Sequence, residues 1–439
     1  MRFIPKRLHR DIELIYSQLF LCICQRCNKK HFTRNRKMPL VQLILTMLNR
    51  RGLTLSLELR KWRELMEIES SISKVGYLKQ RMKLNPEALM VLSRHHNRGL
   101  YEDGEMESWN GYYFFAADGS GLNVPTTQET LEYYGTSSRK DTKPQAALGL
   151  SCIYDMINHT ILECSVNDCK FNEMAEAYKQ WKKTKETVGE RKSVLVMDRG
   201  YPASAYLLEM VEKDEKFVVR LSATNFKKEQ QAMQTEDEWV DIVFDKSRMT
   251  HYRGSETERK MKEKGSIRLR FVRIPLENGN IEYLATNLSE KEFSTRDMGR
   301  IYNLRWTIET VYDVLKNNLE IENFTGTKPV LIEQDIYSCV YLCNLVQDLI
   351  ADAEEEQKRE NIGKYKHPMT INKTYAVGVL KEELIRVIVE PDPRKKEERF
   401  NRMLEEVKNQ VVPIRDHRHF QRTKGKLAGK YSNTHKRSY

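Results

Sequence analysis

Two short, mostly apolar runs, each followed directly by an aspartate, constrain the fold of this chain more than any other feature. The first run is residues 112–117, followed by Asp118, and the second is residues 193–197, followed by Asp198. Runs this short and this apolar are typical of strands buried on both faces. The carboxyl ends of such strands form the edge at which open α/β sheets bind ligands. The sequence therefore predicts that both aspartates lie at that edge.

The segments around these runs predict a mixed sheet with helices on both faces. Between the two aspartates we expect an antiparallel hairpin and then a helix, at 146–154, 160–166 and 172–185. A helix at 203–211 follows the second aspartate. The order strand, hairpin, helix, strand, helix indicates an α/β domain.

The rest of the chain divides into a strand-rich stretch and several helices. Strands are expected at 217–221, 239–244, 267–274 and 281–286, with a charged connector at 248–264. Helices are expected at 14–24, 40–49, 53–67, 295–319 and 331–353, and a further basic helix precedes Pro86. The three short helices between residues 40 and 86 fit either a helix-turn-helix DNA reader or a small helical bundle with solvated lysines.

The positive charge of the chain is concentrated at its two ends. The 439 residues carry 74 Lys and Arg against 62 Asp and Glu, for a net charge of +12. Residues 1–51 hold 12 Lys and Arg against 2 acids, and residues 411–439 hold 8 against 1, so the body between them is mildly acidic. Basic flanks around an acidic body are typical of a core held onto a polyanion, and nucleic acid is the leading candidate.

Cysteine usage and hydropathy restrict the class of protein further. The 8 Cys are irregularly spaced and give no disulfide framework, which fits a reducing, intracellular compartment. No apolar run approaches the roughly 18 residues that a membrane span needs, so we expect no membrane partner.

A pair of neighbouring aspartates needs a chemical reason. Asp118 and Asp198 would repel each other unless a divalent cation were shared between them. The pair suggests either a metal site or an acid/base pair with perturbed pKa values. Taken alone, each aspartate is better explained as the opening residue of a turn.

The helix predicted at 295–319 supplies a third acid. At about 100° per residue, Tyr302, Arg305, Glu309 and Lys316 fall within about 60° of one another on one narrow face. A separate apolar stripe is expected to pack on the sheet, and it consists of Ile301, Leu304, Ile308, Val311, Leu315 and Leu319. Glu309 lies beside this stripe, so it can reach the two aspartates with donors on either side of it.

Three motifs carry a family resemblance: Asp118-Gly119-Ser120, Asp198-x-Gly200-Tyr201 and Tyr302-x2-Arg305-x3-Glu309-x6-Lys316. Together they resemble the signature of DDE transposases from bacterial insertion sequences, in the branch whose third acid lies in a Tyr-Arg-Glu-Lys motif. The resemblance covers about residues 115–329. It implies an α/β fold, with a ribonuclease-H-like mixed sheet flanked by helices, an inserted β-rich subdomain, and helical N- and C-terminal regions.

The resemblance implies the following domain organisation. A helical, basic DNA-binding region is expected at 1–110, and a helical, basic C-terminal region at 356–439. The catalytic domain is expected in two parts, at 111–215 and 295–355, with the β-rich insertion at 216–294 between them.

The resemblance also implies an activity, which is Mg²⁺-dependent DNA strand cleavage and strand transfer in cut-and-paste transposition. Two Mg²⁺ (or Mn²⁺) ions about 3.5–4 Å apart suit this chemistry. Asp118 is expected to bridge both ions, and Asp198 and Glu309 each to complete one. Tyr302, Arg305 and Lys316 are expected to hold DNA phosphates.

The implied partner is double-stranded DNA, both the terminal inverted repeats of the element and the target. A homodimer that pairs two ends, and a cytoplasmic, nucleoid-associated location, are implied as well. Two other functions stay open: a catalytically inactive DNA-binding regulator derived from a transposase, and a two-metal nuclease of the same fold.

Two further features contain residue types that occur at binding sites. Cys22, Cys24, Cys27 and His31 are metal-binding residue types, but no second pair lies at zinc-finger spacing. Trp239 lies in the β-rich segment, where members of this branch hold a flipped base on aromatic residues, and we interpret it as a strand core residue.

Overall fold

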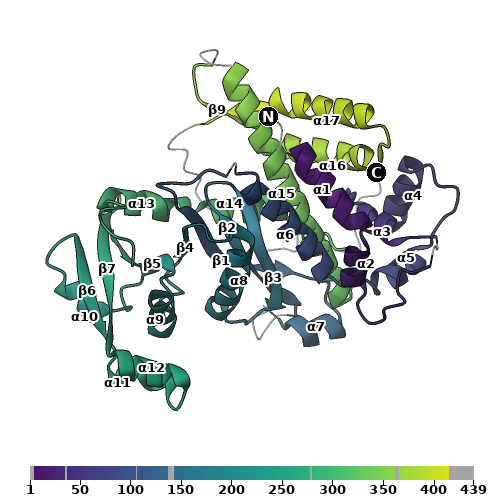
Figure 1. The fold of residues 1–439 in the computed structure, drawn as a ribbon. Helices are drawn as coiled ribbons and strands as arrows, with labels where there is room; N and C mark the ends of the chain where they lie inside the picture. The colour runs from purple at the N-terminus through teal and green to yellow at the C-terminus, as the bar shows by residue number, and fades with distance from the viewer. Residues whose placement is uncertain are drawn as a thin grey trace.

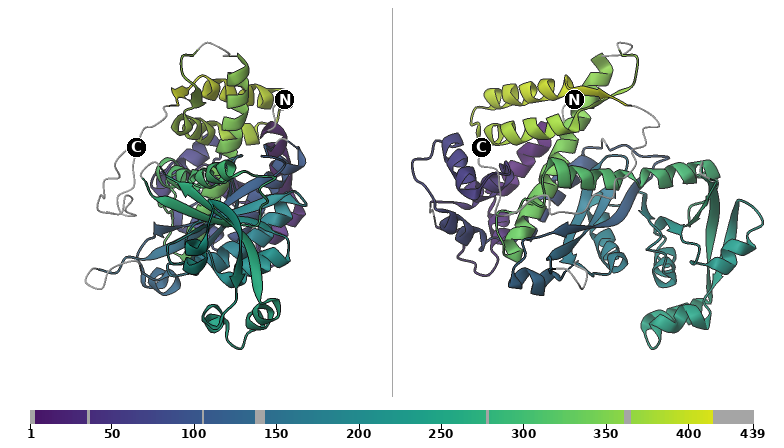
Figure 2. Two further views of the ribbon diagram at one scale, coloured as in Figure 1. Left: turned by 90° about the vertical axis from the view of Figure 1, so that its left-hand side faces the viewer. Right: turned by 180° about the vertical axis from the view of Figure 1, so that it is seen from behind.

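The computed structural model describes residues 4–34, 37–104, 106–136, 143–276, 279–360 and 365–414. Most of the basic C-terminal arm predicted from the sequence lies outside these described residues. Figures 1 and 2 show the arrangement of the helices and strands.

A mixed sheet of eight strands, in the order β3-β2-β1-β4-β5-β8-β7-β6, forms the centre of the described chain. The strands are β1 (Tyr113–Asn123), β2 (Ala147–Asp155), β3 (Thr160–Asp168), β4 (Ser193–Met197), β5 (Lys216–Leu221), β6 (Asp237–Val243), β7 (Ser266–Pro275) and β8 (Ile281–Thr286). β1 is parallel to β4, which is parallel to β5, and the other neighbours are antiparallel. The sheet and its flanking helices confirm the predicted α/β fold class.

The described chain contains seventeen α-helices, of which α8 and α9 pack on one face of the sheet and α14 and α15 on the other. They are α1 (Ile4–Tyr16), α2 (Gln18–Cys24), α3 (Leu40–Leu48), α4 (Leu55–Leu65), α5 (Lys74–Arg81), α6 (Glu87–Glu102), α7 (Gln128–Tyr134), α8 (Glu173–Val188), α9 (Ser204–Glu212), α10 (Lys227–Ala232), α11 (Lys246–Met249), α12 (Glu256–Lys264), α13 (Thr295–Leu304), α14 (Thr307–Asp313), α15 (Pro329–Glu360), α16 (Lys373–Val389) and α17 (Pro393–Lys408). A short pair, β9 (Met369–Ile371) and β10 (Val411–Pro413), lies beside α15 to α17.

Successive residues of β1 point into two separate cores, as the alternation of side chains along a strand requires. Phe114 and Ala116 belong to the core that also contains residues of α14, α15 and the N-terminal helices. Phe115 and Ala117 belong to the core on the other face, which α8 and α9 complete. β1 is therefore buried on both faces, as its apolar sequence predicts.

The 32-residue helix α15 joins both terminal helical regions to the sheet. It packs against α1, α3 and α6 from the N-terminal region, against α16 and α17 from the C-terminal region, and against β3 (Figures 1 and 2). Pro329 stands at its start, where the missing N–H of proline costs nothing. Among the helices described, α15 included, none is both long and apolar enough to cross a membrane.

Several local predictions are wrong in instructive ways. The helix expected at 14–24 is split, because Ser17 ends α1 and its side chain accepts a hydrogen bond from the Phe20 N–H at the start of α2. The connector expected at 248–264 is largely helical, since α12 begins at a Ser255 cap and carries a Glu258–Lys262 ion pair. How the segments divide into domains stays a prediction, although β5 pairs directly with β4 in the central sheet.

A buried polar network links α1, α6 and α15. The Nδ1 atom of His96 lies 2.7 Å from Oδ2 of Asp11, and its Nε2 lies 3.4 Å from Oδ2 of Asp348. Tyr341 donates a hydrogen bond to Asp11, and Arg7 donates to Asp348. Burial lowers the pKa of His96, but the two aspartates outweigh this and raise it to about 9. His96 is therefore a buried cation at neutral pH.

This network predicts a pH dependence of stability. Because the pKa of His96 is raised above its unfolded value of about 6.5, its contribution is complete below that pH and is lost as the pH rises through 9. We expect the free energy of unfolding, measured by denaturant titration, to fall by about 3 kcal/mol between pH 6.5 and 10. His96→Gln should remove this component, whereas the exposed-site control His9→Gln should retain it. An identical pH profile for wild type and His96→Gln would contradict the assignment.

Candidate active site

Asp118 and Asp198 are neighbours because of the register between β1 and β4. The two strands are parallel, and their last pair joins Ala117 to Met197, so an aspartate comes next on each. β4 ends at this point, whereas β1 continues to Asn123 in register with β2. Asp118 thus lies within its strand, and the prediction that β1 stops there is wrong. The structure nevertheless brings the two predicted acids together at the end of β4.

Arg305 connects the third predicted acid to the first. Its Nη2 lies 3.4 Å from Oε1 of Glu309, and its Nη1 lies 4.0 Å from Oδ2 of Asp118. The guanidinium packs between the rings of Tyr302 and Trp306, at 5.6 and 5.0 Å from their centroids. Only 3% of the Arg305 side chain is exposed, against 23% for Asp118 and 34% for Glu309. The arginine is buried beneath acids that solvent can still reach.

Tyr302 and Lys316 contact the same part of the sheet. The Tyr302 hydroxyl donates a 2.8 Å hydrogen bond to Oδ1 of Asp198. The Lys316 ammonium donates to Oγ of Ser120 at 2.7 Å and to the carbonyl oxygen of Gly121 at 3.0 Å. All four residues predicted to share one helix face therefore lie near Asp118 or Asp198, or contact the strand beside them.

The helix that carries these residues is not continuous, contrary to the prediction for 295–319. α13 ends at Leu304, and the backbone N–H groups of Arg305, Trp306, Ile308 and Glu309 bond three residues back, as in a tighter 3₁₀ turn. α14 then widens into a π turn at Val314–Asn318, which carries Lys316. A tighter turn of the helix followed by a wider one changes the directions in which successive side chains point. π turns are also frequent at functional sites.

The two aspartates have opposite pKa shifts. Burial raises the pKa of Asp118 to about 6, against the opposing field of Arg305. Burial alone would also raise the pKa of Asp198, but the Arg199 N–H, the Tyr302 hydroxyl and the two nearby arginines lower it overall. Burial lowers the pKa of Lys316. At neutral pH, Asp118 therefore carries a charge that its surroundings disfavour.

The donor set of the site fits divalent cations. Mg²⁺ prefers oxygen ligands, and carboxylates whose charge is disfavoured by burial gain most from a cation. The oxygens of Asp118, Asp198 and Glu309 do not all lie within 4.8 Å of one another. A single ion held by all three acids would require their oxygens to lie that close together. Two ions about 3.5–4 Å apart would not, because only one of the acids has to contact both ions. The three acids therefore supply the oxygen ligands that a divalent cation needs.

The sequence did not indicate several residues of the site. Arg220 lies 3.8 Å from Asp198, and the Tyr312 hydroxyl donates to the carbonyl oxygen of Asp118. Glu173, at the start of α8, lies against Gly119, and the ring of Tyr201 is buried nearby. The glycine directly after Asp118 was the one feature of the sequence that could have indicated a side chain from another element in that space.

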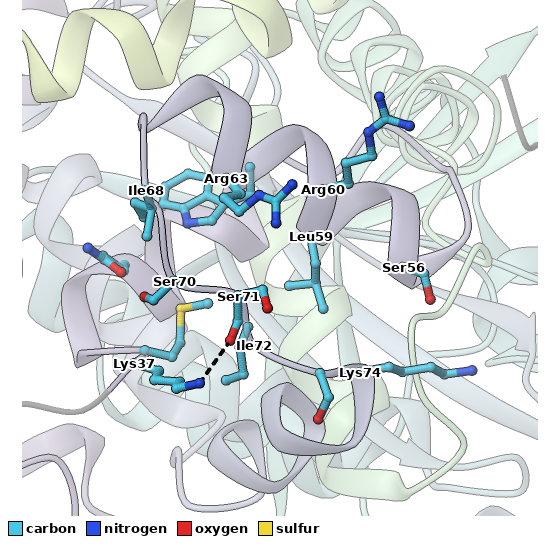
Figure 3. A pocket seen from close by; sticks show the side chains of 14 residues that line it. Lys37, Ser56, Leu59, Arg60, Arg63, Ile68, Ser70, Ser71, Ile72 and Lys74 are labelled. Atoms are coloured by element: carbon cyan, nitrogen blue, oxygen red, sulfur yellow. Dashed lines mark hydrogen bonds between the residues drawn. The ribbon is translucent and has the colours of Figure 1, made fainter.

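A second candidate site lies in the N-terminal helical region, between α4 and α5. This cavity of about 340 Å³ is lined by Lys37, Met38, Gln42, Ser56, Leu59, Arg60, Trp62, Arg63, Ile68, Ser70, Ser71, Ile72, Ser73 and Lys74. Figure 3 shows four basic side chains spread around a row of serines. No acidic side chain is among these lining residues, and the buried Nε1–H of Trp62 has no acceptor. Four basic side chains and no acidic one line the cavity, so its charge suits an anion.

Two other clusters do not form competing metal sites. Glu356, Glu360 and Glu405 are the one group of three possible ligands within 4.8 Å among the residues described. The ammonium of Lys408 already lies 3.6, 2.9 and 2.7 Å from them, so the group is an ion cluster that joins α15 to α17. Cys22, Cys24, Cys27 and His31 are not gathered in this way. Trp239 is half-buried on β6, and its Nε1 donates to Glu290.

Comparisons with known proteins point to one family. A family model for the transposase DDE domain matches residues 109–345. The chain is similar to a piggyBac transposase in a synaptic complex with hairpin DNA, at 8% identity and a TM-score of 0.44, over 90% of this chain and 85% of that one. It is also similar to the Drosophila P element transposase in a strand transfer complex, at 9% and 0.22, over 92% and 98%. At these TM-scores neither likeness transfers an activity. No curated protein matches significantly.

The raised pKa of Asp118 predicts the stability of one variant. Because this carboxyl binds its proton more tightly when folded, its contribution to stability falls as the pH rises from about 4 to 6 and stays low above 6. In EDTA at pH 7.5, we expect Asp118→Asn to be more stable than wild type by at most about 3 kcal/mol in denaturant titrations. At pH 4 the difference should vanish. An Asp118→Asn variant less stable than wild type at pH 7.5 would show that the folded protein does not disfavour the charged form of Asp118.

Proposed function

The chain belongs to the transposase DDE domain family, and we propose that it is the transposase of a bacterial insertion sequence. It binds the terminal inverted repeats of its element, cuts the DNA there, and joins the freed ends to a target in cut-and-paste transposition. The observation that carries this proposal is the position of Asp118 beside Asp198, with Glu309 linked to them by Arg305.

We propose that these three acids hold two Mg²⁺ (or Mn²⁺) ions. Such a pair supplies activation of the attacking water or 3′-hydroxyl and stabilisation of the leaving oxygen. The Tyr302 hydroxyl fixes the orientation of the Asp198 carboxylate by its hydrogen bond. Arg305 balances part of the negative charge and holds Glu309 toward the sheet. Lys316, anchored on Ser120 and Gly121, keeps a cation beside the acids where a DNA phosphate would lie.

DNA is the proposed partner, and a homodimer is proposed to pair the two ends of the element. The basic cavity between α4 and α5 supports a DNA-binding role for the N-terminal helical region, because Lys37, Arg60, Arg63 and Lys74 surround it (Figure 3). Exposed cations on short helices are suited to phosphate contacts, which position a protein on DNA whatever the base sequence.

Glu309→Gln tests the catalytic proposal. It keeps the size of the side chain but removes the charge that a cation needs, so we expect cleavage and strand transfer of repeat-bearing duplexes to fall about 10³-fold or more. Binding to the same duplexes, measured by gel shift, should stay within about twofold. Cleavage is read on denaturing gels with Mg²⁺ or EDTA. Asp313→Asn, an exposed acid on the same helix, is the matched control and should behave as wild type.

Three results would contradict the proposal. Cleavage by Glu309→Gln at the wild-type rate would remove Glu309 from the site. Cutting of duplexes without the repeats, with no joining of ends, would identify a nuclease instead. End binding without any Mg²⁺-dependent scission by the wild type would identify a regulator.

The basic cavity predicts how DNA binding responds to salt. Each phosphate contact adds about 0.9 to the slope of log K against log salt concentration. We expect the double variant Arg63→Ala/Lys74→Ala to weaken end binding and to reduce that slope by about 1–2. The control Lys182→Ala/Lys183→Ala removes two exposed charges from α8 and should leave the slope unchanged. An equal effect of both pairs would show that the cavity has no special part in binding.

A further inference from the structure

A fourth carboxyl group lies against the strand that carries Asp118. A β-carbon added at Gly119 would lie 2.9 Å from Cδ and 3.0 Å from Oε1 of Glu173. The space that a side chain at position 119 would fill is therefore occupied by this carboxyl. At Gly121, two residues further along β1, nothing lies within 4 Å of an added β-carbon. The close approach is specific to the residue next to Asp118.

Glu173 approaches the site from the face opposite Glu309. Gly119 continues the β1 face of Phe115 and Ala117, which α8 and α9 cover, whereas Asp118 continues the other face. β4 is the neighbour of β1 on one side, and it ends at Met197, opposite Ala117. Beside Asp118 there is therefore no β4 backbone to separate the two faces of the sheet. Glu173 is exposed and lies close enough that its charge acts on the Asp118 carboxyl.

An independent observation points to a bound group between these acids. Tyr201, in the turn after Asp198, is only 3% exposed, and its hydroxyl has no hydrogen-bond partner. Burial raises its pKa, and the charges of Glu173, Asp118 and Asp198 raise it further, so the hydroxyl lies within the field of all three. A buried hydroxyl left unpaired is energetically unfavourable, and nearly all such groups in proteins have a partner. The Tyr201 hydroxyl is a hydrogen-bond donor, and none of these three carboxylates accepts its hydrogen bond. It therefore needs another acceptor.

We propose that Glu173 and Tyr201 hold a water molecule of the cation that Asp118 and Asp198 bind. Glu173 accepts a hydrogen bond from this water, and the Tyr201 hydroxyl donates one to it. Mg²⁺ loses its waters reluctantly and keeps several of them in proteins, so side chains that fix a bound water also fix the ion. Glu173 and Tyr201 act through the water, which makes them positioning residues. The inference rests on the proposed function only in that Asp118 and Asp198 are cation ligands.

A purely structural explanation exists for Glu173 and makes a different prediction. An acid in the first turn of a helix interacts favourably with the helix dipole. Glu176 is also in the first turn of α8, but it pairs with Lys179 and is not among the atoms close to Gly119. Glu176→Gln therefore removes the same dipole interaction without touching the site.

Binding of Mn²⁺ to the full chain without DNA, measured by calorimetry and by electron paramagnetic resonance of free Mn²⁺, tests the proposal. We expect Glu173→Gln to weaken binding about 10–100-fold, the usual effect of losing a group that supports a metal site from outside its ligands, and Tyr201→Phe to weaken it about tenfold. Glu176→Gln should bind as wild type. Gly119→Ala should weaken Mn²⁺ binding as much as Glu173→Gln does, because the added methyl group displaces the Glu173 carboxyl. The double variant Gly119→Ala/Glu173→Gln should bind no more weakly than either single variant. Gly378→Ala, on α16, is the control for Gly119→Ala, because nothing lies within 4 Å of a β-carbon added there either.

The outcomes separate this proposal from the proposed function. If Asp118→Asn abolishes Mn²⁺ binding while Glu173→Gln and Tyr201→Phe bind as wild type, the water-holding role is overturned and the cation site stands. If Glu176→Gln weakens binding as much as Glu173→Gln, the dipole explanation replaces it. Wild-type protein that binds no Mn²⁺ would overturn both proposals.

Discussion

The parallel register of β1 and β4 is the constraint on which the site depends. It sets two aspartates side by side, in a position where burial disfavours the charge of Asp118 and the charges of Glu309 and Glu173 disfavour it further. The arrangement persists because the strands are locked between two apolar cores, so that neither aspartate can move away without disrupting packing. Arg305 and Tyr302 then offset part of the cost locally. Strain of this kind is expected where a cation is to be bound.

A second set of buried charges ties the N-terminal helices to the catalytic half of the chain. Asp335 is fully buried on α15, and it forms ion pairs with Arg50, which follows α3, and with Arg81 of α5. Its other oxygen accepts the N–H of Thr325, in the loop that follows the π turn. Two arginines from the proposed DNA-binding region therefore meet one carboxylate of α15. Removing one partner of such a group costs about 3–5 kcal/mol, so the two regions are held as one unit.

Much of this architecture could be predicted from the sequence because it rests on local pattern. The apolar run at Ser193–Met197 ends at the strand boundary observed, and the helix-face argument placed Glu309 with Lys316 and Arg305 near the aspartates. The same argument assumed a uniform helix. The 3₁₀ turn at Arg305 and the π turn at Lys316 depend on how side chains meet the sheet, which no single-helix pattern contains. Glu173 was missed for a related reason, since only the packing of α8 on β1 brings it to Gly119.

The position of the bound cations tests the central claim most directly. Crystals grown with Mn²⁺ and a repeat-bearing duplex would locate the ions by anomalous scattering. The account predicts two peaks about 3.5–4 Å apart. Asp118 should lie within about 2.3 Å of both peaks, and Asp198 and Glu309 should each lie that close to one. Peaks confined to other acids, such as Glu356, Glu360 and Glu405, or a bound complex in which the three acids stay apart, would contradict it.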